Sequence, residues 1–416
     1  MFDFDQEKTC FEENCIACGA CVEACPIIPL TDIRDDDPGE IMASVMDLYR
    51  DGKISEMAKT RIFSCTSCSI CLPHCPEDLN PGLGLCLARS ILRDKGEPLP
   101  HALSFLLPDT KFNFMKAVEA FQITPVERPW ITDVAGKTPA QAKTVFFTGC
   151  SGILQPDVVL TGLEMIRRID PTVKALGGVD YCCGQTTFRV GDIHGAGDLL
   201  DLLIEALNAL SPERVVFLCP TCKAYVESNG PKRAWSSHFI TEFLADRLEQ
   251  LGPLNEVNAS VTIHDPCHTA RGEHADVESP RKLLGAIPGL ELVEMENSRE
   301  KALCCGASAV PAVGKAGIKL RAQRLKQAGE SGADILGLYC PGCQSIFASE
   351  GPKQPFRIES VITILGRAMG IVHEDKLKRY FAHENPEKAL SDAERCIEGS
   401  ELPKEALVKF GARYFK

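Results

Sequence analysis

A four-cysteine run that ends in proline occurs twice near the start of the chain. The pattern is Cys-x-x-Cys-x-x-Cys-x-x-x-Cys-Pro, and it occupies Cys15–Pro26 and again Cys65–Pro76. Three cysteines at this spacing wrap three corners of a cubane iron–sulfur cluster, whereas the fourth, displaced by a turn, ligates the other cluster. A zinc site needs four ligands, usually as two pairs, and does not explain a doubled run. The pattern predicts two cubane 4Fe-4S clusters, held by Cys15, Cys18, Cys21 and Cys75 (cluster 1) and by Cys65, Cys68, Cys71 and Cys25 (cluster 2).

The 39 residues between the two motifs, from Pro26 to Ser64, predict helices rather than a compact β-type ferredoxin. Asp37 and Pro38 form a helix start with Glu40 as a capping-box partner, and Gly52 is a stop signal. A second helix is expected from Asn80-Pro81 to Gly96. Cys10 and Cys86 lie outside the motif spacing, so we interpret them as core or incidental thiols.

The chain has 416 residues, of which 21 are cysteines, and its N-terminal residues contain no apolar secretory segment. Clustered cysteines without such a segment favour reduced, metal-binding thiols in the cytoplasm. The formal net charge of −12 and the absence of a basic run exclude phosphate-driven nucleic-acid binding. The most apolar window, Val361–Val372, is too short for a membrane span, so we expect a cytoplasmic protein that reaches the inner face of a membrane only through partners.

The second half of the chain repeats itself. Cys150, Cys182-Cys183-Gly184 and Cys219-Pro-Thr-Cys222 recur as Cys267, Cys304-Cys305-Gly306 and Cys340-Pro-Gly-Cys343. Short apolar runs alternate with helical stretches in both copies, which predicts parallel βα units with cysteines at the carboxyl ends of strands. The predicted strands are Thr144–Thr148, Arg214–Leu218, Val261–Ile263 and Asp334–Leu338, and the predicted helices include Ala196–Leu210 and Gly314–Ala328.

The overall prediction is an α+β multidomain chain with two tandem α/β domains related by duplication. Residues 1–100 form a helical ferredoxin segment, 144–256 the first copy and 257–372 the second copy. Residues 101–143, rich in proline, are expected to form a surface linker with one short helix near Phe112–Phe121. The charged tail, 373–416, is expected to be a helical extension that is solvated or faces a partner.

Each copy carries five cysteines, one more than a simple four-ligand metal site requires. An adjacent Cys-Cys pair needs a backbone turn, which Gly184 and Gly306 can supply. Such a set suits a larger, irregular iron–sulfur cluster, or zinc with a spare thiol.

These motifs resemble the cysteine-rich CCG domain. The stretches His264–His268, Pro280-Arg281, Ile287–Gly289, Leu292–Met295 and Cys304–Ala307 resemble the catalytic subunit of heterodisulfide reductase, and Ser237–Leu244 adds to the match. The wider family includes the iron–sulfur subunits of glycolate oxidase and anaerobic glycerol-3-phosphate dehydrogenase, and the ferredoxin segment resembles helical ferredoxin domains of fumarate and heterodisulfide reductases. The resemblance spans residues 10–372.

The resemblance implies two non-cubane four-iron clusters, with a substrate disulfide cleaved between them. The implied ligands are Cys150, Cys182, Cys183, Cys219 and Cys222 in the first copy, where zinc remains an alternative, and Cys267, Cys304, Cys305, Cys340 and Cys343 in the second.

His264 and His268 flank Cys267. Either is a candidate proton donor to a thiolate, because a pKa near 6.5 suits proton delivery at neutral pH, but both can equally cap a helix or bond a strand end. Arg189 and Arg271 are candidates for holding a substrate carboxylate, although surface positioning is the commoner role of such residues.

The sequence carries neither a dinucleotide-binding glycine motif nor a phosphate-binding loop. We therefore expect an electron-transfer subunit that depends on a flavoprotein partner, with a membrane cytochrome b or quinone as further candidates. Three functions stay open: a heterodisulfide-reductase-like subunit, the iron–sulfur subunit of a flavin-linked glycolate, lactate or glycerol-3-phosphate dehydrogenase that passes electrons to quinone, and a zinc-bound scaffold or redox sensor.

Overall fold

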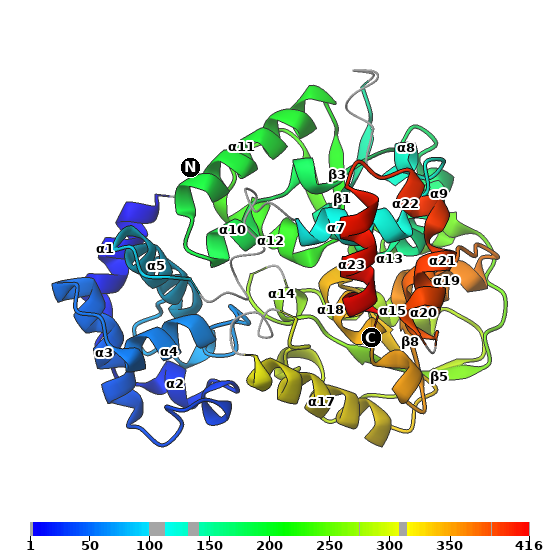
Figure 1. Ribbon diagram of the computed structural model, residues 1–416. Coiled ribbons are helices and arrows are strands. Elements are labelled where there is room, and N and C mark those ends of the chain that lie inside the picture. The colour runs from blue at the N-terminus through cyan, green and yellow to red at the C-terminus, as the bar shows by residue number, and fades with distance from the viewer. Residues whose placement is uncertain are drawn as a thin grey trace.

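The computed structural model describes residues 3–99, 113–131, 141–273, 275–307, 314–383 and 385–415. In Figure 1 the ferredoxin segment (blue) lies on the left, the first copy (mostly green) at the top, the second copy (yellow to orange) below it, and the tail (red) on the right. The helical and α/β parts predicted from the sequence are all present, so the α+β assignment is confirmed.

The ferredoxin segment is a bundle of short helices. Asp37 caps α3 by accepting a hydrogen bond from the Glu40 amide, and Gly52 ends it in the left-handed conformation, as predicted. Asn80 caps α5 in the same way. Apolar side chains of α3 and α5 fill the core between the helices. The helices are α1 (Phe4–Asn14), α2 (Ala20–Glu23), α3 (Pro38–Asp51), α4 (Glu56–Ser64) and α5 (Pro81–Asp94), with 3₁₀ turns at Ile28–Leu30 and Leu72–His74.

The first copy is built on a four-stranded parallel sheet in the order β2-β1-β3-β4. The two central strands are almost fully buried, because helices cover both faces. The elements are β1 (Thr144–Gly149), α9 (Pro156–Ile169), β2 (Lys174–Gly177), α10 (Gln185–Arg189), α11 (Ile193–Ala209), β3 (Arg214–Phe217), α12 (Pro220–Asn229), β4 (Ser236–Phe239) and α13 (Ile240–Ala245). Short 3₁₀ turns lie at Cys150–Leu154, Val179–Tyr181 and Leu248–Leu251.

The second copy repeats this topology with the strand order β6-β5-β7-β8. Its elements are β5 (Ala259–His264), α14 (Cys267–Ala270), α15 (Glu278–Gly285), β6 (Leu290–Leu292), α17 (Lys315–Glu330), β7 (Ile335–Leu338), α18 (Pro341–Ala348), β8 (Arg357–Ser360) and α19 (Val361–Ala368), with 3₁₀ turns at Arg299–Lys301 and Gly351–Lys353. The matching sheets confirm the predicted duplication.

Equivalent helices join the two copies. α9 of the first copy packs on α19 of the second, and α15 of the second packs on α13 of the first. The approach is close: a Cβ at Gly366 would lie 2.4 Å from the Thr161 Cγ2 atom. Since α9 of the first copy corresponds to α15 of the second, and α13 to α19, the same pair of positions makes both contacts with the copies interchanged. The copies are therefore related by an approximate two-fold axis, and one apolar core runs through both.

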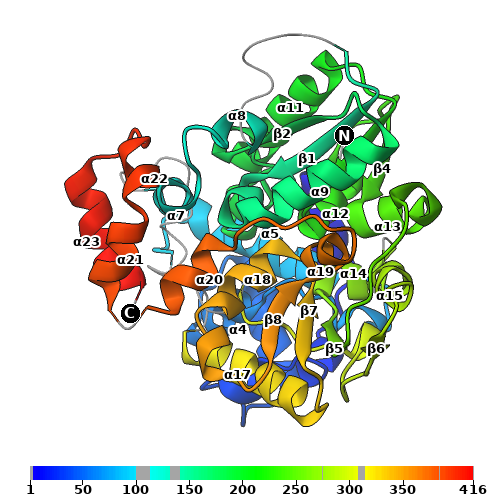
Figure 2. The same ribbon diagram turned by 90° about the vertical axis from the view of Figure 1, so that its right-hand side faces the viewer.

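The tail forms four helices, α20 (Lys376–Phe381), α21 (Pro386–Asp392), α22 (Glu394–Glu398) and α23 (Lys404–Tyr414). They pack with α7 (Phe114–Gln122) of the linker around a small apolar core that includes Phe121, Tyr380 and Phe415 (Figure 2). α8 (Arg128–Ile131) follows α7. The tail is therefore helical, as expected. Of the two alternatives expected for it, the solvated extension differs from the structure, because most of its sparse apolar residues reach the core shared with α7.

Among the described residues, no helix combines the length and apolar character needed to cross a membrane.

Candidate functional site

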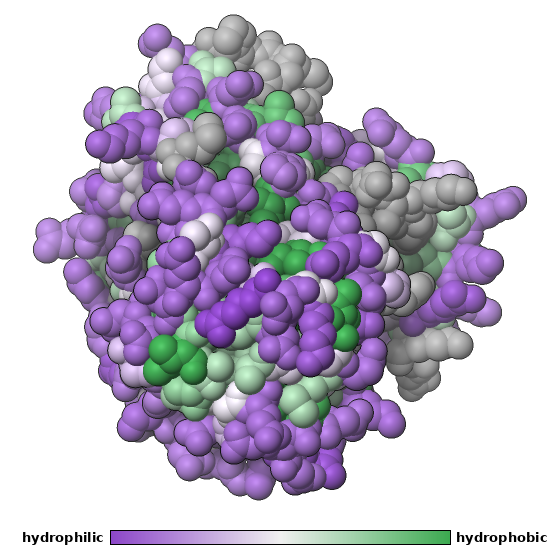
Figure 3. All heavy atoms as spheres, turned by 90° about the vertical axis from the view of Figure 1, so that its left-hand side faces the viewer, coloured by the Kyte–Doolittle hydropathy of each residue, from purple (hydrophilic) through white to green (hydrophobic). Residues whose placement is uncertain are grey.

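Cys15, Cys18, Cys21 and Cys75, the predicted cluster 1 ligands, line one pocket of the ferredoxin segment. Cys18 and the neighbouring Ile16 are exposed, the latter to 61%. Burial raises the pKa of Cys15, and the nearby Cys75 and Cys18 raise it further. The face of the molecule on the side of the ferredoxin segment is mostly hydrophilic, with small apolar patches (Figure 3). Of the four predicted ligand sets, the thiols of this pocket thus lie nearest to the outer surface.

The two cysteine loops have the same backbone geometry. Ala17 and Ser67, each two residues after the first cysteine of its motif, have φ of 54° and 53°, and Gly19 and Ser69 have φ of 80° and 60°. Non-glycine residues seldom adopt this left-handed region, and such strain concentrates at functional sites. One result is that the Ser67 amide donates to the Cys65 sulfur at 3.4 Å.

Arg61 links the two predicted cubane sites. Its guanidinium is almost fully buried, and it donates to the Cys25 sulfur at 3.9 Å and to the Cys21 carbonyl at 3.4 Å. It lowers the pKa of the Cys21 thiol, against the larger raising effect of burial. A buried cation between two thiol sets suits a site that is anionic when loaded, since an isolated buried charge is otherwise costly.

The five thiols of the first copy form one connected set. Cys182 hydrogen-bonds with Cys150 and Cys183, Cys183 with Cys222, and Cys222 with Cys219. They follow β1, β2 and β3 at the carboxyl edge of the sheet. The turn after the Cys-Cys pair needs glycine, because Gly184 has φ of 86° and a Cβ there would lie 2.4 Å from the Ala196 carbonyl oxygen.

The second copy repeats the arrangement. Cys305 hydrogen-bonds with Cys304 and Cys343, and Cys343 with Cys340. Cys267 lies near Cys305, and burial followed by that thiol raises the pKa of Cys267 to about 12. The predicted turn is again present, with Gly306 at φ of 81°, and the Gly306 amide donates to the Cys304 sulfur at 3.3 Å.

The two sets meet at the boundary between the copies. The thiols of Cys219 and Cys340, which occupy equivalent positions, hydrogen-bond with each other. Beside them lies a cavity of about 540 Å³, lined by all five cysteines of the first copy, by Cys340 and by Cys65 of the ferredoxin segment. Its other walls include Phe114 of α7 and Phe381 and Tyr414 of the tail, and both Phe rings contact the Tyr414 ring. The cavity therefore joins all three domains.

Cys68 brings the predicted cluster 2 next to the second copy, where it raises the pKa of both Cys267 and Cys304, adding to larger effects of burial and of Cys305. Arg271 holds this contact by donating to the Cys68 carbonyl at 3.1 Å, to the Glu300 carbonyl at 2.7 Å and to the Ala302 carbonyl. Its guanidinium is thus occupied with tying two domains together, which favours the positioning role over carboxylate binding.

Arg189 lines the cavity and also ties domains together, since it donates to the Thr66 carbonyl at 2.9 Å. Arg89, which the sequence did not single out, is fully buried and donates to the carbonyls of Ile62, Cys65 and Arg189. Sequence patterns do not reveal Arg89, because a buried arginine on a helix has the same local sequence as an exposed one.

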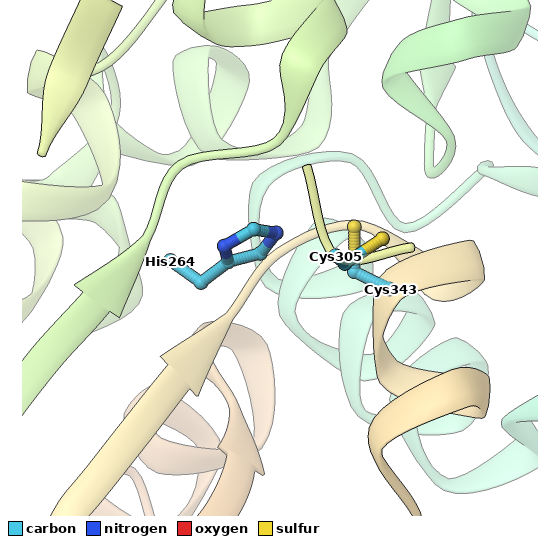
Figure 4. Close-up of side chains that lie close together, drawn as sticks. All are labelled: His264, Cys305 and Cys343. Carbon is cyan, nitrogen blue, oxygen red and sulfur yellow. The ribbon is translucent and has the colours of Figure 1, made fainter. Parts of the chain in front are cut away.

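The two candidate histidines differ in their surroundings. His264 is completely buried at the end of β5, beside Cys305 and Cys343, and burial lowers its pKa (Figure 4). His268 is partly buried on α14, where burial and then Arg189 lower its pKa to about 4. Both imidazoles are therefore neutral at pH 7, which favours hydrogen bonding over proton delivery.

The thiol sets fit iron–sulfur clusters. All cysteines are free, each set converges in a small volume, and backbone amides or a buried cation are directed at the sulfurs. Cys86 stays outside the sets, buried on α5 with its sulfur 3.4 Å from the Ser67 hydroxyl, and Cys10 is exposed.

Comparison with known proteins agrees with this domain organisation. The family described as a 4Fe-4S dicluster domain matches residues 14–80, and the cysteine-rich domain family matches residues 144–227 and 261–348. The chain is 26% identical to one subunit of the dihydromethanophenazine:CoB–CoM heterodisulfide reductase of Methanosarcina barkeri, over 86% of this chain and 94% of that protein.

Two further relatives carry other names. One subunit of the fumarate reductase (CoM/CoB) of Methanothermobacter marburgensis is 28% identical over 87% of this chain and 72% of that protein. The EtfAB:quinone oxidoreductase of Syntrophomonas wolfei is 22% identical over 88% of this chain and 59% of that protein. All three are oxidoreductases or their subunits.

Proposed function

Because this chain belongs to the iron–sulfur oxidoreductase subunits that join a 4Fe-4S dicluster domain to two cysteine-rich CCG domains, we propose that its cavity is the terminal reaction site of an electron-transfer complex. The observation that carries the proposal is the meeting of Cys219 and Cys340 beside a cavity that also reaches Cys65. One space thus adjoins both CCG sets and the ferredoxin segment.

The ligands of this proposal are the four cysteine sets given above, as two cubane and two non-cubane four-iron clusters. Bound iron–sulfur clusters supply single-electron steps. The thiol sets lie in series. Cys71 lies within electrostatic range of Cys21, Cys68 lies within range of Cys267 and Cys304, and the Cys340 thiol contacts that of Cys219. A flavoprotein partner at the exposed cluster 1 face would supply the electrons, and a membrane cytochrome b is the alternative donor.

The reaction we favour is reduction of a disulfide, as the name of the Methanosarcina relative suggests. Two electrons and two protons break the S–S bond and give two thiols. All five thiols of the first CCG copy and Cys340 of the second line this one cavity, which suits a reaction whose two products are both sulfur ligands.

Quinone reduction is the second candidate, and the cavity wall favours it. Phe114, Phe381 and Tyr414 form an aromatic side, and the only cationic side chains among the described lining residues are Arg89 and Arg189. Such a wall suits an uncharged ring better than a substrate with several anionic groups. Two electrons and two protons would convert the quinone to a quinol.

Anaerobic purification from the native cell, followed by metal analysis and turnover, tests these proposals. Four four-iron clusters predict about 16 iron atoms per chain. Zinc with little iron would instead support a scaffold or sensor and overturn the electron-transfer function. For the loaded complex, electrons should pass to an added disulfide; transfer to a soluble quinone alone would select the second candidate, and the co-purifying polypeptides identify the donor.

A further inference from the structure

His264 is held by a buried arginine. The Nε atom of Arg324, on α17, donates to the Nδ1 atom of His264 at 2.9 Å, and neither side chain is exposed. The imidazole extends from the end of β5 toward two sulfurs (Figure 4). The ligand atoms of His264, Cys305 and Cys343 lie within 4.8 Å of one another.

This contact fixes the tautomer of His264. An arginine Nε always carries hydrogen, so Nδ1 must accept, and the single N–H of the neutral ring is then on Nε2. The Nε2 atom is buried and meets no nitrogen or oxygen acceptor among the described residues, and the group beside it is the Cys305 thiol. His264 therefore presents an N–H donor, rather than a lone pair for a metal, at the thiols of Cys305 and Cys343.

Arg324 brings a positive charge without an ion pair in the described part of the chain. Its Nη1 atom donates to the Gln327 side chain at 3.1 Å and to the Asn297 carbonyl, and its Nη2 atom is buried without a partner. The neighbouring carboxylate, Asp265, is already bound by Arg281 at 2.8 and 3.0 Å. Since an isolated buried charge is costly, an anionic group at the thiols is the natural counterion.

The first copy has neither group. Cys150 and Cys267 are equivalent, which aligns His264 with Phe147. A Cβ at Gly184 or Gly306 would lie 2.4 Å from the carbonyl oxygen of Ala196 or Gly317, respectively, and this register aligns Arg324 with Leu203. Phe147 and Leu203 are both fully buried in an apolar core. The duplicated domains thus place a phenyl and an isobutyl group where the second copy has an imidazole and a guanidinium.

We infer that His264 and Arg324 give the second CCG site a higher reduction potential than the first. Both an N–H donated to sulfur and a nearby positive charge stabilise the more negative, reduced state of a cluster. His264 acts directly on the site, and Arg324 is a positioning residue that also contributes its charge. This inference rests on the proposed function, because it requires iron–sulfur clusters in the CCG copies.

The test uses the full complex in a Cys183→Ser background, in which the first CCG site is disabled. Redox titration followed by EPR then reports the second CCG site. Replacing His264 and Arg324 by their first-copy counterparts, His264→Phe and Arg324→Leu, should each lower the reduced-to-oxidised ratio at a fixed potential by about tenfold, or ~59 mV for a one-electron couple. His264→Gln restores an N–H donor, so the potential of the second site should return most of the way to its original value. Phe147→Leu, in the first copy, should leave the potential of the second site unchanged.

Unchanged potentials in both His264→Phe and Arg324→Leu would overturn the inference while leaving the proposed function intact. Absence of the second-site signal from the complex before these changes would overturn the proposed function itself. Pulsed EPR on the unaltered complex provides a test that does not depend on variant folding. We expect a weakly coupled histidine nitrogen with an exchangeable proton, and a strong coupling typical of a directly bound nitrogen would contradict the assignment of His264 as a donor.

Discussion

The two CCG copies have the same strand order and the same five cysteines, yet differ in what surrounds those cysteines. In the first copy, all five thiols line the shared cavity, and the shell behind them is apolar. The second copy contributes only Cys340 to the cavity and has the buried His264–Arg324 pair. Duplication preserved the ligands, while divergence of the surrounding residues separated a cavity-facing site from an enclosed one.

The copies also differ in their neighbours. Cys68 of the ferredoxin segment influences Cys267 and Cys304, and Arg271 of the second copy holds the Cys68 loop. The tail follows only the second copy, but its Phe381 and Tyr414 line the cavity that the first copy dominates. This comparison suggests that electrons enter through the second copy and leave through the first. The higher potential inferred for the second site makes this last step uphill, so it depends on removal of electrons at the cavity.

The largest expected effect separates these two roles. Cys183→Ser and Cys305→Ser alter equivalent ligands, and each should abolish turnover and remove about four iron atoms. With Cys183→Ser, the physiological donor should still reduce the second site, because its contact with Cys68 is intact. With Cys305→Ser, the first site should stay oxidised. EPR after mixing with the donor measures both outcomes, and normal reduction of the first site in Cys305→Ser would instead make Cys65 the point of transfer.

A smaller effect is expected at the contact between the ferredoxin segment and the second copy, which Arg271 forms. Arg271→Met removes the hydrogen bonds that hold the Cys68 loop against the second copy, and hydrogen bonds from a charged donor are worth about 1.5–3 kcal/mol each. Reduction of the second site should slow by about tenfold, as followed by stopped-flow absorbance. Arg93→Met is the matched control, because Arg93 joins the ferredoxin segment to Asp192 of the first copy at 3.2 Å without contacting a cysteine. Equal slowing in both variants would point to general loosening of the domains.

Local sequence signals were sufficient for much of the fold. The caps at Asp37 and Asn80, the stop at Gly52 and the turn at Gly184 all involve residues close in sequence, so their geometry follows from local chemistry. The central strands were predicted because they are buried and apolar. The edge strands β2, β4, β6 and β8 were missed, since each has only three or four residues and most carry polar side chains.

The residues around the ligands depend on long-range packing and could not be predicted in this way. Arg324 lies on α17, a helix rich in charged residues, and only the tertiary structure shows that it faces inward to meet His264. Arg61 is similar. The packing of the tail could not be predicted, because its apolar residues are widely spaced, although Leu377, Tyr380 and Leu407 all reach one core.

The glycine turns provide a comparison in which the copies should behave alike. Gly184→Ala and Gly306→Ala each place a methyl group against a carbonyl oxygen in the left-handed region, which should destabilise the protein by roughly 1–3 kcal/mol. Thermal unfolding under anaerobic conditions measures the loss. Gly197→Ala, on α11, is the control, because its Cβ meets nothing within 4 Å and alanine favours a helix. A loss confined to one copy would show that the two turns are not equivalent.

The smallest expected effect concerns the tail, which follows the second copy and has no counterpart after the first. Lys376 binds both oxygens of Glu127 at 2.6 and 2.8 Å, and this pairing, against the raising effect of burial, leaves the pKa of Glu127 lowered from 4.5. A lowered folded-state pKa stabilises the folded form above pH 4.5, and this stabilisation disappears as the pH falls through the folded value.

Lys376→Met should therefore increase opening of the tail by roughly fivefold at pH 7, equivalent to about 1 kcal/mol, and by less near pH 4. Hydrogen exchange of α20 measures this opening, and Lys404→Met, which removes an exposed contact with Glu394, should have little effect at either pH. Because Phe381 and Tyr414 line the cavity, a looser tail should also raise the KM of an apolar substrate. A looser tail with an unchanged KM would mean that the substrate contacts only the cysteine side, and the asymmetry between the copies would then lie in their ligand surroundings alone.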